Sequence, residues 1–117
     1  MASDAAFDAD RLRELFGEDE GELVAFLGFA LCSIREVIEG LATAVARRDG
    51  EATERLGHEL KGACANAGAR SLEALGQRLE EAGSAHSWAY AEQLIEDAEM
   101  ALAEVAAYVT ARASNRR

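Results

Sequence analysis

The chain has 117 residues, half of them hydrophobic, which is enough for one domain with its own core but too little for two ordinary domains. Proline is absent and alanine occupies 26 positions, a composition that favours helices over a β-sandwich or barrel. The formal net charge of −10 repels phosphate backbones and excludes an ordinary nucleic-acid partner. No apolar run is long enough to span a bilayer, so no membrane partner is expected.

Several common classes of protein are disfavoured by what the sequence lacks. The start, Met1 to Asp4, does not have the basic and then apolar plan of a signal peptide, so we expect a cytoplasmic protein. Cys32 and Cys64 have no metal-binding spacing, and no metal site is expected. A glycine-rich phosphate loop and a Ser/His/Asp set are also missing, which disfavours a small classical enzyme.

The predicted elements are helices joined by short turns. A short helix at about 7–16 comes first and is expected to cover one end of the molecule. Four longer helices follow, each with a single apolar stripe, at about 20–48, 51–67, 69–82 and from Ser84 or Ser87 to about 113. We expect Gly83 to end the third of these longer helices, because glycine is a common helix terminator.

Single apolar stripes and short loops predict an all-α fold, an antiparallel up-down-up-down four-helix bundle. We expect residues 1–117 to form a single domain, with the bundle at about 20–113 and a C-terminal tail at 114–117.

The segment 51–67 contains a histidine that points away from the apolar stripe of its own helix. Leu56 and Leu60 lie on the stripe when successive residues are turned by ~100°. His58 then lies about 200° from Leu56, on the opposite side of the helix. We therefore expect the imidazole of His58 to be exposed to solvent in the middle of a helix.

Two glycines, Gly57 and Gly62, bracket His58 in a segment otherwise rich in alanine. Each costs a helix interior about 1 kcal/mol relative to alanine. We interpret Gly62 as open space beside the imidazole, through which another protein surface can approach. Lys61 supplies a positive charge that would stabilise an anionic group on the ring. The spacing alone also fits an ordinary solvated histidine with a solvated lysine nearby.

The run His58-Glu59-Leu60-Lys61-Gly62, followed by Gly68 and a leucine-rich segment, resembles the histidine-containing phosphotransfer (HPt) family. The signature of that family is His-x-x-Lys-Gly with another glycine six residues later. The resemblance covers nearly the whole chain. It implies a phosphorelay intermediate in which His58 accepts a phosphoryl group from the aspartyl phosphate of a receiver domain and passes it to another receiver. Lys61 and Gly62 match the stabilising charge and the cleared space.

The resemblance also sets expectations about partners and cofactors. The partners would be response-regulator receiver domains and a hybrid histidine kinase. The chain would be a monomeric phosphocarrier without kinase activity and without a cofactor, because the receiver binds the Mg²⁺. The reactive atom would be Nε2 of His58, with Nδ1–H held by a neighbour. Glu80 is the first candidate for that neighbour and Gln77 the second, although both also fit ordinary solvated residues.

Phe29, Glu59 and Ala65 are the candidate docking residues for a partner. Phe29 lies about 140° from the apolar stripe of its helix, as expected for an exposed aromatic at an interface. It could instead pack against the short first helix, near Leu12, Leu15 or Phe16. Glu59 stands where a small polar residue is common in the family, and its charge would tune which receiver is accepted.

Two other functions compete with the phosphocarrier. One is the dimerisation and phosphoacceptor segment of a sensor histidine kinase, whose box often begins His-Glu-Leu, as His58-Glu59-Leu60 does here. That box usually continues with Thr-Pro, and it predicts a dimer of two-helix hairpins. The other is a helical interaction module in which His58 is incidental.

Overall fold

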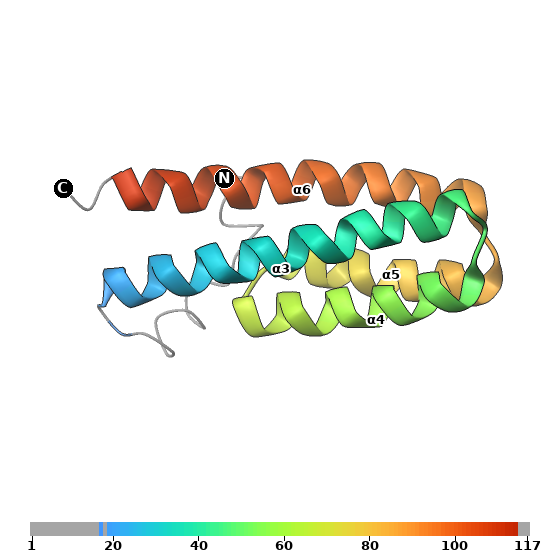
Figure 1. Cartoon of the computed structure of the whole chain (residues 1–117), viewed down its shortest axis with the longest axis horizontal. Coiled ribbons are helices and arrows are strands. Elements are labelled where there is room, and N and C mark those ends of the chain that lie inside the picture. Colours follow the sequence, from blue (N-terminus) through green and yellow to red (C-terminus); the bar gives the residue numbers. More distant parts are fainter. Residues whose placement is uncertain (1–16, 18, 115–117) are drawn as a thin grey trace.

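The computed structural model describes residues 17 and 19–114, and within them it contains helices and no strands. The helices are α3 (Glu20–Ala46), α4 (Gly50–Ala67), α5 (Arg70–Ala85) and α6 (Trp88–Ser114). Consecutive helices run antiparallel in one bundle (Figure 1). The predicted all-α four-helix bundle is confirmed. The expected helix at 7–16 and residues 115–117 of the expected tail lie outside the described residues.

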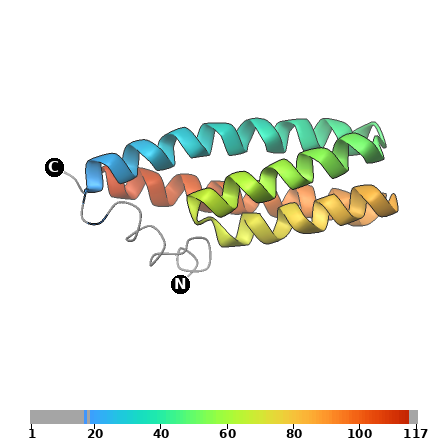
Figure 2. The ribbon, with the colours of Figure 1, turned by 90° about the horizontal axis from the view of Figure 1, so that it is seen from below.

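The two ends of the bundle are built differently. The turns α3–α4 and α5–α6 lie together at one end, and α4 and α5 are shorter than the other two helices (Figure 1). The first turns of α3 and the last turns of α6 therefore continue beyond the α4–α5 turn. Arg112 of α6 bonds Glu20 of α3 there, with Nε 3.3 Å from Oε2. In Figure 2 the pair α4 and α5 lies side by side along its whole length.

Short polar side chains begin two of the helices. The Asp19 carboxylate accepts from the backbone N–H of Glu22 at 3.0 Å, and the Asp49 carboxylate accepts from that of Ala52 at 3.0 Å. Each bond satisfies a backbone donor that has no partner within its own helix. The first long helix ends at Ala46 rather than at the expected residue 48, because Arg48 turns the chain with a φ of 57°.

The expected end of the third long helix at Gly83 is wrong. Helix α5 continues through Gly83 to Ala85, and His86 ends it in the left-handed conformation with a φ of 55°. Gly83 is buried, and a Cβ on it would lie 2.7 Å from the backbone nitrogen of Glu54 and 2.9 Å from the Cβ of Thr53. This glycine is therefore needed for close packing between helices, and not for a turn.

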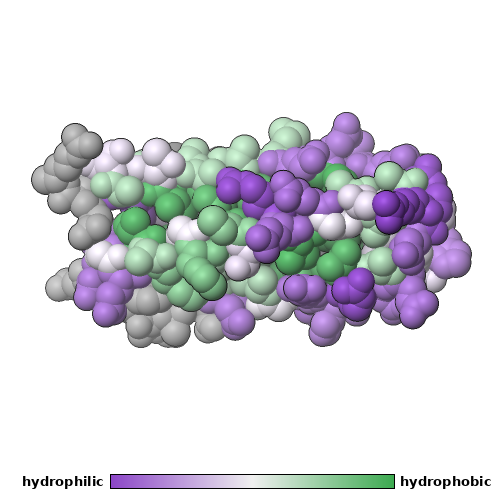
Figure 3. Space-filling view, viewed as in Figure 1, coloured by the Kyte–Doolittle hydropathy of each residue, from purple (hydrophilic) through white to green (hydrophobic). Residues whose placement is uncertain are grey.

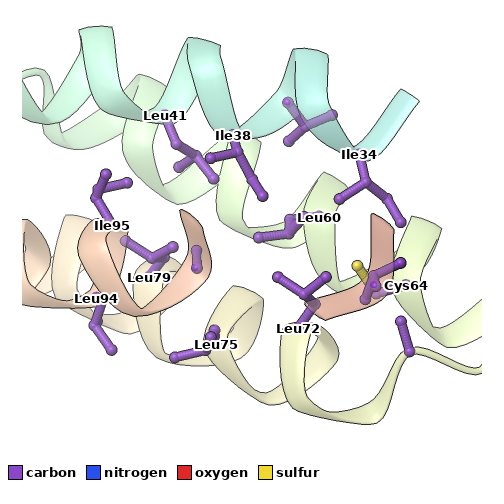
Figure 4. Packing of buried hydrophobic residues seen from close by; sticks show 14 of the residues in the cluster. Ile34, Ile38, Leu41, Leu60, Cys64, Leu72, Leu75, Leu79, Leu94 and Ile95 are labelled. Carbon is purple, nitrogen blue, oxygen red and sulfur yellow. The ribbon is translucent and has the colours of Figure 1, made fainter. Parts of the chain in front are cut away.

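The core runs along the bundle axis and receives leucine, isoleucine and valine from all described helices. Figure 4 shows side chains from the four helices meeting there, among them Ile38, Leu60, Leu79 and Leu94. On the face seen in Figure 3, hydrophilic residues dominate the end that holds the α3–α4 turn, and apolar residues are exposed nearer the other end. Full burial of each large aliphatic side chain contributes about 1.5–3 kcal/mol, so this core is the main source of stability.

The buried stripe of α4 differs from the predicted one by a rotation about the helix axis. Its buried residues are Thr53, Gly57, Leu60, Cys64 and Ala67. The predicted reference residue Leu56 is only partly buried, on the side of the helix that faces α3. Small residues of α4, among them Thr53 and Gly57, contact α5, whereas Leu56 contacts Gly40 of α3.

Candidate functional site

His58 stands on the outward face of α4. Its side chain is 73% exposed, whereas Leu60, two residues further on, is fully buried in the core. Because successive helical residues are turned by about 100°, burial of Leu60 directs His58 to the solvent side. Both edges of the ring are thus available, one to a neighbouring helix and the other to solvent.

Glu80 of α5 reaches the inner edge of this ring. The Nδ1 atom of His58 lies 3.4 Å from Oε1 of Glu80, whose side chain is 27% exposed. A carboxylate accepts hydrogen bonds and cannot donate them. Of the two neutral tautomers of His58, it therefore favours the one with the proton on Nδ1. In that tautomer Nε2 carries the free lone pair. Glu80, the first candidate neighbour in the sequence, is therefore the residue that the structure places at Nδ1.

A glycine contact between α4 and α5 explains how Glu80 comes so close. A Cβ on Gly57 would lie 2.5 Å from the backbone nitrogen of Glu80, and a Cβ on Gly76 would lie 2.7 Å from that of Lys61. The two helices therefore touch backbone to backbone at these positions. Gly57 is buried, and its lack of a side chain brings α5 toward His58.

A second bridge between the same helices lies next to the first. Lys61 is half-buried, and its ammonium donates to Oε1 of Gln77 at 2.5 Å. The amide nitrogen of Gln77 donates in turn to Oε2 of Glu81 at 2.7 Å. Gln77, the second candidate neighbour of His58, is thus placed against Lys61. His58 and Lys61 are three residues apart on one helix, so they share one face of α4.

Gly62 leaves this face open. A Cβ at Gly62 would meet nothing within 4 Å, and the residue is exposed. Gly57, by contrast, packs against the backbone of α5, although both are glycines in the interior of the same helix. The surface beside the imidazole is therefore bare backbone, which another protein can approach closely.

Sequence reasoning missed two residues of this arrangement, Gly76 and Glu81. A signal for Gly76 was available, since it is a costly glycine inside a helix and lies seven residues before Gly83, at the spacing of one helix face. Glu81 had no comparable signal. Its contact with Gln77 is an ordinary pair of residues four apart on a helix.

The candidate docking residues are spread over two helices. Phe29 of α3 is 77% exposed. Glu59 is exposed on α4, and Ala65 is half-buried near the end of α4. The alternative partners of Phe29 on the predicted first helix lie outside the described residues.

The site consists of an imidazole, an ammonium group and carboxylates, without the ligand set of a metal centre. No group of three or more His, Cys, Asp or Glu within residues 19–114 is arranged to hold a metal ion. The described helices also include none that is long and apolar enough to cross a membrane. Cys64 of α4 is buried in the core, and burial raises the pKa of its thiol from 9.0 to about 12, with a smaller contribution from Glu73. A thiol with this pKa stays protonated and unreactive near neutral pH.

Comparison with known proteins adds independent findings. The family described as Hpt domain matches residues 26–110. The crystal structure of histidine-containing phosphotransfer protein B (HptB) from Pseudomonas aeruginosa PAO1 is 26% identical, with a TM-score of 0.86 over 96% of this chain and 97% of that one. The HPT domain from the Hpt sensor hybrid histidine kinase from Shewanella is 21% identical, with a TM-score of 0.74 over 95% of this chain and 96% of that one. No curated protein matches the chain.

Proposed function

Because the chain belongs to the Hpt domain family, it is a phosphotransfer intermediate of a phosphorelay, and we propose that His58 is the residue that carries the phosphoryl group. Its partners are phosphorelay proteins such as receiver domains and histidine kinases. The observation that carries the assignment to His58 is the exposed ring at the centre of α4, with a carboxylate at Nδ1.

The transfer uses the free lone pair of Nε2. Nε2 of His58 attacks the phosphorus of an aspartyl phosphate on the receiver, a P–N bond forms, the acyl P–O bond breaks, and the aspartate leaves as a carboxylate. The ring then carries a positive charge with its proton on Nδ1, which the Glu80 carboxylate stabilises. Lys61 offers its ammonium to the phosphoryl oxygens, and the empty space at Gly62 admits the receiver. Return of the group to another receiver reverses these steps.

We further propose that the chain acts as a pure carrier. It gains phosphate from a receiver and has no kinase activity, so ATP alone should leave it unlabelled. It needs no cofactor of its own, and the Mg²⁺ that the transfer requires is bound by the receiver. A chelator should therefore stop transfer but leave the hydrolysis rate of the isolated phosphorylated chain unchanged.

We also propose a monomer that works in the cytoplasm, where receiver domains are found. The four helices bury one core within a single chain, which favours this over the hairpin dimer of a kinase segment. Light scattering of the purified protein gives the mass directly. A dimer of the size of two chains would contradict the proposal and reopen the kinase-segment alternative.

Receiver docking is proposed to cover Phe29, Glu59 and Ala65 around His58. Aromatic side chains contribute strongly at protein interfaces, and Phe29 is the most exposed large hydrophobic residue among those described. Replacement of Phe29 by alanine should raise the half-saturating receiver concentration by about tenfold, the cost of a modest interface residue. An unchanged concentration would remove Phe29 from the docking surface.

Phosphate transfer from a labelled receiver tests the assignment to His58. The wild type should acquire phosphate that is labile in acid and stable in alkali, and His58→Gln should acquire none. His86→Asn is the matched control, because His86 is also exposed on this chain and asparagine tolerates its left-handed backbone. Label on His58→Gln would refute the assignment, and a wild type that takes no label would favour the interaction-module alternative.

A further inference from the structure

Two bridges of equal spacing connect α4 to α5. Glu80 lies against His58, and Gln77 bonds Lys61. His58 and Lys61 are three residues apart on α4, and Gln77 and Glu80 are three residues apart on α5. Because α4 and α5 run antiparallel (Figure 1), this equal spacing places the two bridges side by side.

Gln77 restricts the position of the Lys61 ammonium without occupying all of its N–H donors. The ammonium has three N–H donors, and the amide oxygen of Gln77 accepts one of them at 2.5 Å. The others remain available for a phosphoryl group. A lysine side chain is otherwise among the most mobile, so a group that holds it in place beforehand lowers the entropy lost when it binds an anion.

Glu81 determines which way the amide of Gln77 faces. Its carboxylate accepts from Nε2 of Gln77 at 2.7 Å, so the amide oxygen is turned toward Lys61. The reversed amide would place two donors against each other at Lys61 and two acceptors against each other at Glu81. Donors and acceptors thus match along Lys61–Gln77–Glu81 in only one orientation of the Gln77 amide.

We propose that Gln77 and Glu81 are positioning residues for phosphoryl transfer, which hold the Lys61 ammonium beside His58 before the phosphoryl group arrives. This inference rests on the proposed function of His58. Gln77 and Glu81 act through Lys61 and touch neither the phosphoryl group nor the imidazole. Their effect therefore exists only when Lys61 is present.

A double-mutant cycle tests this dependence. The variants are Gln77→Met, Lys61→Met and the pair together, and the readouts are the maximal transfer rate from a phosphorylated receiver and the half-saturating receiver concentration. Gln77→Met should slow the maximal rate about three- to tenfold and leave the half-saturating concentration unchanged. With methionine already at Lys61, it should cause no further slowing. An equal slowing in both backgrounds would overturn the proposal.

Exchange of the two side chains provides a rescue. In the variant Gln77→Glu with Glu81→Gln, the carboxylate at position 77 can accept from Lys61 and the amide at position 81 can donate to it, at the same net charge. This variant should return the rate to within about twofold of wild type, and either single change should not. Failure of the exchange to exceed the single variants would contradict the proposed chain of bonds.

The matched control lies on α6, where Gln93 donates to Asp97 at 3.1 Å in the same four-residue spacing, on a different helix from His58 and Lys61. Gln93→Met should leave transfer unchanged. Thermal melting of every variant identifies any that fail to fold. If Gln77→Met does not fold, the transfer rate of the exchange variant still tests the proposal. A wild type that takes up no phosphate would refute the function of His58. A wild type that is labelled normally, with equal slowing by Gln77→Met in both backgrounds, would refute only the role of Gln77.

Discussion

Replacement of Gly76 by alanine tests the contact that brings α5 against α4. A Cβ at Gly76 would lie 2.7 Å from the backbone nitrogen of Lys61, 3.0 Å from its Cα and 3.0 Å from the carbonyl oxygen of Gly57. All three are backbone atoms of a packed helix, so no side chain can rotate away. The helices would have to separate by roughly 0.7 Å to restore ordinary van der Waals contact.

Two opposing terms determine the net effect. The free-energy cost of overpacking against backbone atoms lies at the upper end of the usual range, about 3 kcal/mol. Alanine regains about 1 kcal/mol of helix propensity over glycine. We therefore expect Gly76→Ala to lower the free energy of unfolding by about 2 kcal/mol and the melting temperature by about 8 °C.

Gly62→Ala is the matched control, since the added Cβ meets nothing within 4 Å. Only the propensity term remains, so this variant should be about 1 kcal/mol more stable than wild type. Urea unfolding followed by circular dichroism measures both variants. The same substitution in the interior of two neighbouring helices should thus change stability in opposite directions. A Gly76→Ala protein as stable as wild type would refute the backbone contact and with it the explanation of how Glu80 reaches His58.

Two further predictions concern transfer and alkaline stability. Gly62→Trp should retain the helical circular dichroism of the wild type and slow transfer at least tenfold, because the indole fills the space that the receiver needs; an unchanged rate would contradict the open approach. For Cys64, the folded-state pKa of about 12 exceeds the ordinary value of 9.0, so the folded chain keeps a proton that the unfolded chain releases. Stability should therefore fall as the pH rises from 9 toward 12, and Cys64→Ala should flatten this part of the profile.

The helices and their order could be predicted from sequence because they depend on local periodicity. An apolar stripe at steps of three and four defines each helix without knowledge of its neighbours. The exposure of His58 follows in the same way, since its direction is determined relative to Leu60 on its own helix. The motif around it was enough to indicate the family and its chemistry.

The partners of these side chains depend on how the helices pack, and local pattern does not contain that information. Gly83 was predicted to end a helix and instead packs inside one, because glycine serves both purposes and only its contacts with Glu54 and Thr53 of α4 distinguish them. Gly57 and Gly62 look equivalent along the chain, yet one faces the backbone of α5 and the other faces solvent.

Sequence alone indicated the candidate phosphoacceptor, His58, and the direction in which it points, because both follow from the motif and periodicity of a single helix. The packing of α4 against α5 places Glu80 at Nδ1 of His58, Gln77 against Lys61, and Glu81 against Gln77. These contacts depend on the close approach of α4 and α5. That approach is set by glycines far apart in the chain, whose meeting no local pattern shows.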